Sequence, residues 1–143
     1  MSRFECPSGW LRVRPVTMVA GDSRLDLPAS PMSAGLARAF VRRCWSHLES
    51  ADTIDAVALC VSELVTNALD HAPPPYELRV ARGCGRLRVE VADASARPPV
   101  LRPLSPTARR GRGIFLVECI ATQCGVEPTT AGKTVWAEFT TSG

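Results

Sequence analysis

Four polar side chains stand close together near the end of an otherwise apolar helical pattern. Glu63 and Asn67 are four residues apart, and Asp70 and His71 follow within another turn. On an α-helix this spacing puts side chains at neighbouring positions of one side. A carboxylate can act as a general base, and a carboxylate with an amide oxygen can bind Mg²⁺. Solvated surface pairs have the same spacing, so both interpretations stay open.

A second candidate is the aspartate at the end of a predicted strand. Asp93 follows alternating valines and precedes the small residues Ala94 and Ser95. A carboxylate at this place can accept a hydrogen bond from an exocyclic amine, and small neighbours let a flat ring approach the backbone. An aspartate before a loop is also typical of an Asx-turn. Asp93 alone therefore does not identify a binding site.

A third candidate is a glycine pair that precedes a predicted helix. Gly111 and Gly113 allow the backbone to approach an anion, and a helix N-terminus adds free N–H groups and the positive end of its dipole. Arg110 and Arg112 add charges that can bind phosphate. A flexible hinge would have the same composition. The pattern is not the dinucleotide fingerprint, because no strand leads into it and the later glycine is absent.

The composition predicts a soluble protein of one domain. The chain has 143 residues, of which 45% are hydrophobic and 22% charged, and no apolar run approaches the roughly 18 residues of a membrane span. The first residues lack the apolar core of a signal peptide, so a cytoplasmic location is expected. The six cysteines are then expected to be reduced, and since none forms a Cys-x-x-Cys pair, zinc is not expected.

The basic residues do not indicate a nucleic-acid partner. Sixteen of the seventeen are arginine, they are scattered along the chain, and aromatic residues are few. We therefore expect no direct contact with nucleic acid, although a small nucleic-acid-binding or structural domain remains an alternative interpretation.

Periodicity and turn signals predict the elements that must position these residues. They are a strand at 23–27, a helix from Ser30 to about Glu49, a helix capped by Asp52 or Thr53 and ended by Pro73, a hairpin turning at Gly83–Gly85, a loop over 94–110, a helix from Gly111 to about Thr122 ended by Gly125, and strands at 126–128 and 134–140. Residues 1–21 are expected to form an N-terminal arm, and 22–143 one domain. Strands with inserted helices predict an α+β fold, with helices on one face of a mixed, mostly antiparallel sheet.

The order of these motifs resembles the ATP-binding boxes of the GHKL superfamily, in which a two-layer α/β sandwich of the Bergerat type holds ATP. The segments SELVTNALDHA, VEVADAS, GRGIFLVECIATQCGV and GKTVWAEF are similar to those of small actinobacterial proteins related to anti-sigma-factor serine/threonine kinases. The resemblance covers residues 23–140. It implies a histidine-kinase-like ATPase fold with ATP and Mg²⁺ as cofactors.

The resemblance implies roles for the matching residues. Glu63 matches the general base, and Asn67 matches the asparagine that ligates Mg²⁺. Asp93 matches the aspartate that receives the adenine amino group, and Thr134 matches the threonine that helps to hold adenine through water. Asp70 and His71 receive no role from the match.

The resemblance also implies a phosphate side and one departure at the adenine. The residues expected along the phosphates are Arg110, Gly111, Arg112, Gly113 and Ile114. Ser95 is expected to contact the nucleotide at a position where the wider superfamily commonly has glycine, so its hydroxymethyl group can narrow the adenine pocket.

The function implied is ATP-dependent serine/threonine phosphorylation of an anti-anti-sigma-type regulator in a partner-switching circuit. The alternative is an ATP-binding regulator without catalysis that sequesters a sigma factor or another protein. Proteins of this kind often form dimers, so a homodimer is included among the expectations. The short loop before Gly111 fits both alternatives.

Overall fold

The computed structural model describes residues 22–97, 117 and 120–141 of the chain. Its strands and helices, in chain order, are β1 (Ser23–Leu27), α1 (Ser33–Trp45), α2 (Ala51–His71), β2 (Tyr76–Gly83), β3 (Arg86–Asp93), β4 (Gln123–Pro128) and β5 (Lys133–Thr140). The predicted arm over residues 1–21 and most of the predicted loop and third helix lie outside the described residues.

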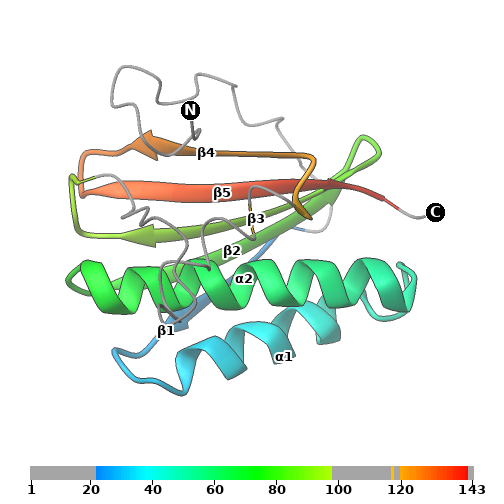
Figure 1. The fold of residues 1–143 in the computed structure, drawn as a ribbon, viewed down its shortest axis with the longest axis horizontal. Helices are drawn as coiled ribbons and strands as arrows, with labels where there is room; N and C mark the ends of the chain where they lie inside the picture. Colours follow the sequence, from blue (N-terminus) through cyan, green and yellow to red (C-terminus); the bar gives the residue numbers. More distant parts are fainter. Residues whose placement is uncertain (1–21, 98–116, 118–119, 142–143) are drawn as a thin grey trace, which may run out of the picture.

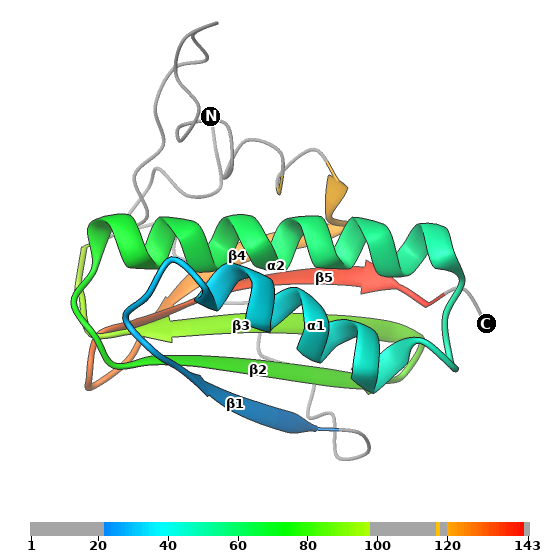
Figure 2. The same ribbon diagram turned by 90° about the horizontal axis from the view of Figure 1, so that it is seen from below.

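The five described strands form one sheet in the order β1-β2-β3-β5-β4. Both described helices cover the same face of this sheet, as Figures 1 and 2 show from two directions. The predicted α+β two-layer sandwich is therefore confirmed. All four strand pairings within the described residues are antiparallel, so this part of the sheet is not mixed.

Helix α1 is shorter than the periodicity predicts. Ser30 and Pro31 lie in a turn before it, where the Ser30 hydroxyl accepts the N–H of Met32 at 3.2 Å. The helix ends at the buried Trp45, four residues before the predicted end at Glu49. There the buried Glu49 carboxylate accepts Nε–H of Arg82 on β2 at 2.9 Å, and this contact fixes the course of the chain after the helix.

Helix α2 carries the predicted core stripe. The residues of that stripe are buried: Ile54, Val57, Ala58, Val61, Leu64, Val65 and Ala68. The helix begins earlier than predicted, because the hydroxyl of Ser50 accepts the N–H of Thr53 at 3.2 Å and acts as the N-cap. It ends at His71, since Ala72 before Pro73 is extended. None of the described helices is long and apolar enough to cross a membrane.

Two local turns differ from the sequence prediction. Gly83 still pairs with Arg86, so the hairpin turn consists of Cys84 and Gly85 alone, with φ of 54° and 74°. Positive φ at both positions is typical of the type I′ turn that joins twisted strands. Gly125 lies inside β4 opposite Trp136 and does not end the preceding helix.

The face of the sheet opposite the helices carries charged pairs around a buried tryptophan. The guanidinium of Arg88 lies 4.2 Å from the centre of the Trp136 ring, and its side chain is only 2% exposed. It donates to Glu90 at 2.6 Å and to the buried Glu138 at 3.0 Å. This cluster joins β3 to β5 on the face of the sheet that α1 and α2 do not cover (Figure 1).

Candidate functional site

A small pocket lies between α2 and the adjacent ends of β3 and β5. It is lined by Leu64, Asn67, Ala68, His71, Val91, Asp93, Lys133 and Val135. The free volume is about 10 Å³, which is close to the space of one water molecule. Its lining combines aliphatic side chains with the polar groups of Asn67, His71, Asp93 and Lys133.

Asp93 is the buried acid of this pocket. Its side chain is 1% exposed. Oδ1 accepts a hydrogen bond from the N–H of Ser95 at 2.8 Å, which is the predicted Asx-turn, and another from Lys133 Nζ at 2.9 Å. Nζ is equally close to Oδ2, but Oδ2 has no hydrogen bond of good geometry within the described residues. Asp93 therefore offers a buried acceptor to the pocket.

The register of β3 and β5 decides which neighbour of Asp93 faces the pocket. Asp93 is opposite Lys133, and Ala92 is opposite Thr134. Side chains alternate along a strand, and the buried Val135 lines the pocket, so Thr134 lies on the other face of the sheet. In this register Lys133 and Val135 face the pocket, whereas Thr134, which was predicted to help hold adenine through water, lies on the opposite face. Counting back by two from Val135 would have revealed it.

Gly132 holds the start of β5 against the Asp93 turn. A Cβ atom at this position would lie 2.2 Å from the carbonyl oxygen of Asp93 and 2.7 Å from Cα of Ala94. The Gly132 N–H donates to the Thr129 hydroxyl at 3.0 Å. Only glycine permits this approach of the two backbones, a requirement that arises from a contact across the sheet.

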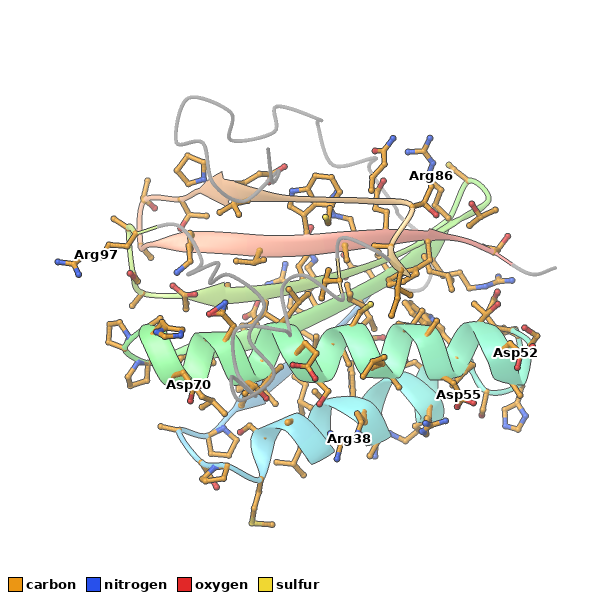
Figure 3. The ribbon with its side chains drawn as sticks, in the orientation of Figure 1. Arg38, Asp52, Asp55, Asp70, Arg86 and Arg97 are labelled. Atoms are coloured by element: carbon orange, nitrogen blue, oxygen red, sulfur yellow. The ribbon has the colours of Figure 1, made fainter. Side chains whose placement is uncertain are left out.

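The polar residues at the end of α2 separate into two groups. Asn67 and His71 line the pocket with Asp93. Asp70, labelled in Figure 3, lines a second and larger pocket of about 290 Å³ with Thr66 and Tyr76 on the side of α1. The expectation that Asp70 and His71 extend one side is therefore wrong, because adjacent helical residues point about 100° apart.

Glu63 lies one turn before Asn67 and is half-buried. Burial raises the pKa of its carboxyl, and the charge of Arg38 on α1 opposes this shift in part. Arg38 itself donates to the hydroxyl of Ser62 at 2.8 Å. A carboxylate with a raised pKa is a better proton acceptor near neutral pH.

The remaining predicted residues lie at or beyond the end of β3. Ser95 is half-buried, and its hydroxyl accepts the N–H of Arg97 at 3.1 Å. The predicted phosphate side, Arg110, Gly111, Arg112, Gly113 and Ile114, lies outside the described residues. The structure thus brings Asn67 and Asp93 together and adds Gly132 and Lys133, which the motif interpretation had not assigned.

Comparisons with known proteins agree with this architecture. Residues 27–139 match the model of the histidine kinase-like ATPase domain family. No curated protein matches the chain significantly. Among solved structures, the crystal structure of the RsbU and RsbW domains of Rv1364c from Mycobacterium tuberculosis superposes with a TM-score of 0.65 at 18% identity. The match covers 84% of this chain and 32% of that one, so this chain spans about a third of its length. Identity this low shows a shared fold.

Proposed function

The chain belongs to the family of histidine kinase-like ATPase domains, and from this premise we propose that it is an ATP-dependent regulator that phosphorylates a serine or threonine of a partner protein. The observation that carries the proposal is the buried Asp93 acceptor at the end of an apolar pocket between α2 and the sheet. We propose that the adenine base of ATP binds in this pocket.

The residues present fit an adenine base. Oδ2 of Asp93 is buried and lies 2.9 Å from Lys133 Nζ, but it makes no hydrogen bond within the described residues. A buried acceptor without a well-aligned donor is costly. An exocyclic amine supplies such a donor. Leu64, Ala68 and Val91 offer aliphatic surface to the flat faces of a ring.

Asn67 is proposed to bind Mg²⁺ together with phosphate oxygens. Its side chain lines the same pocket as that of Asp93. Within the described residues no group of three or more His, Cys, Asp or Glu side chains could hold a metal ion, and Mg²⁺ beside a nucleotide commonly needs only one or two protein ligands. The ion, when bound, neutralises charge on the phosphates.

Glu63 is proposed to accept the proton of the partner's hydroxyl. Its raised pKa, caused mainly by burial, suits a base that works near neutral pH. It lies on the same side of α2 as Asn67, four residues earlier. Phosphate-side contacts are proposed for Arg110 to Ile114, following the resemblance of that segment to the family's second glycine box.

The partner proposed is an anti-anti-sigma-type regulator, with a sigma factor as the protein released or held by the switch. The support is the resemblance of the motifs to anti-sigma-factor kinases and the fold shared with a chain that contains an RsbW domain. A cytoplasmic location and a homodimer belong to the same proposal.

Phosphate transfer to a captured partner tests this function. The tagged chain is used to isolate its partner from the native cell, and the partner is then incubated with Mg²⁺, ATP and either the wild type or Glu63→Ala. We expect phosphoserine or phosphothreonine on the partner with the wild type only, although both proteins bind ATP. Equal control of the partner by both proteins would favour the regulator without catalysis.

A further inference from the structure

Lys133 is the only lysine in a chain whose other sixteen basic residues are arginines. Its side chain is 5% exposed, and it lies at the first position of β5, directly opposite Asp93. Lysine carries a compact charge on a flexible stem, whereas arginine has a rigid planar head that suits fixed, bidentate contacts. The flexible side chain of a lysine at this position can pair with a carboxylate and can also move away from it.

The ammonium group of Lys133 already fills the donor position that a base needs. Nζ is 2.9 Å from both carboxylate oxygens of Asp93. An exocyclic amine would approach the same oxygens from the same pocket. In the structure, Asp93 therefore accepts from the Lys133 ammonium the kind of hydrogen bond that an exocyclic amine donates, although the amine is neutral.

The pocket that the described residues form beside the pair is too small for an adenine base while Lys133 stays where it is. About 10 Å³ is free, whereas pockets for small ligands have on the order of 300–1,000 Å³. The lining side chains other than Lys133 are mostly short or are held by the core, including Val91 and Val135. Movement of the long lysine side chain is the simplest way to make room.

We propose that Lys133 determines nucleotide affinity and base preference, because its ammonium group is exchanged for the exocyclic amine of the base when a nucleotide binds. The inference rests on the proposed function of the same site. Exchange requires a nucleotide base that donates a hydrogen bond to Asp93, so amine-bearing bases are accepted. A base with a carbonyl group at that place presents an acceptor to a carboxylate and cannot replace the lysine.

The exchange has a consequence for variants of Lys133. In the free protein the lysine compensates the buried charge of Asp93, and loss of one member of a buried pair leaves the other uncompensated. In the complex the base supplies a donor, so the loss of Lys133 matters less. Lys133→Met is therefore expected to destabilise the free protein and to tighten ATP binding at least tenfold.

Calorimetric titration with Mg²⁺ and ATP measures this difference directly. Arg79→Met is the matched control, because it removes a cation of the same sheet that pairs with Asp22 on the other face, and its affinity for ATP should equal that of the wild type. Inorganic tripolyphosphate, which has no base, should bind Lys133→Met and the wild type equally. Lys133→Gln keeps a neutral hydrogen-bond donor, so its gain in ATP affinity should be intermediate. This variant provides the test if Lys133→Met does not fold.

The wild type provides an independent test, because selective ¹³C and ¹⁵N labelling of its single lysine gives one set of side-chain signals. The exchange predicts that these signals shift on addition of Mg²⁺ and ATP, and that the ammonium protons exchange faster with water. Unchanged lysine signals at saturating ATP, or equal or weaker ATP binding by both Lys133 variants, would overturn the exchange and leave the proposed function standing. If neither the wild type nor the variants bind ATP at millimolar concentration, both proposals are wrong.

Discussion

Lys133 and Asp93 face each other across β5 and β3, with Nζ 2.9 Å from both carboxylate oxygens. Both side chains are almost fully buried. Burying two charges costs several kcal/mol per ion and is offset only when the geometry is good and further hydrogen bonds are made. The N–H of Ser95 provides one such bond to Asp93. The carboxylate of Asp93 is therefore held by both the Lys133 ammonium group and the N–H of Ser95.

Gly132→Ala should destabilise the protein and weaken ATP binding. The new Cβ would lie 2.2 Å from the backbone oxygen of Asp93, so the turn that carries the carboxylate must move. Overpacking of this kind costs about 1–3 kcal/mol. Urea unfolding measures the loss, and an ATP titration measures the displacement of Asp93.

Gly35→Ala is the control for that substitution. It lies within α1, and its added Cβ would meet only Arg38 Nη2 at 3.5 Å, an ordinary contact. We expect a gain of about 0.5–1 kcal/mol, since alanine is the better helix former. If Gly132→Ala were as stable as the wild type, the close approach of the two backbones would be contradicted.

Arg88→Met should lower the free energy of unfolding by about 3 kcal/mol. It removes the cation between Glu90 and Glu138 and leaves a buried carboxylate on β5 with less compensation. The exposed pair of Arg42 with Asp55 is the reference, and Arg42→Met should cost less than about 1 kcal/mol. Equal losses for the two variants in urea would mean that the Arg88 cluster is not a buried network.

Glu63 should make stability fall as the pH rises. Its carboxyl has a pKa raised above the ordinary 4.5, mainly by burial, so the folded state binds the proton more tightly than the unfolded state. The favourable contribution is present below pH 4.5 and is lost as the pH rises through the raised pKa. Glu63→Gln should therefore gain stability relative to the wild type between pH 4 and pH 7 in urea unfolding. A constant or opposite difference would contradict the burial of this carboxyl.

Cys60 and Cys84 should differ sharply in reactivity. Burial raises the pKa of Cys60 to about 12, so only about one thiol in 10⁴ is a thiolate at pH 8. Cys84 is exposed in the turn between β2 and β3. Iodoacetamide should modify Cys84 and leave Cys60 unmodified in peptide mass spectra, and both should react in urea. If iodoacetamide modified the two thiols at equal rates in the folded protein, the core around α2 would have to open readily.

Helix α2 shows what the sequence can predict well. Its seven stripe residues repeat at three- and four-residue steps and all are buried, because the sheet covers one side of a long amphipathic helix. The residue at which α2 begins was less predictable. Ser50, Asp52 and Thr53 are all good capping residues, and only the hydrogen bond from the N–H of Thr53 identifies Ser50 as the cap.

The sequence motifs predicted two of the side chains that line the pocket, but they did not predict which residues of β5 face it. Motif order indicated Asp93 and Asn67, and both line one pocket. The same motif favoured Thr134, which lies on the opposite face of the sheet from the pocket. A shift of one residue along a strand is enough to move a side chain from one face to the other. The role of Gly132 depends on a backbone contact with Asp93 across the sheet, which no local pattern contains.

Asp93 is proposed to receive the adenine base of ATP. Calorimetric titration of the wild type and Asp93→Asn with Mg²⁺ and ATP tests this role most directly. Thermal unfolding of both proteins first confirms that the variant is folded. Loss of a charged acceptor weakens binding by about 1.5–3 kcal/mol, roughly ten- to a hundredfold. We predict saturable binding by the wild type and a loss of that size in the variant. An equal affinity of the two proteins, or no binding to the wild type at millimolar ATP, would contradict the account.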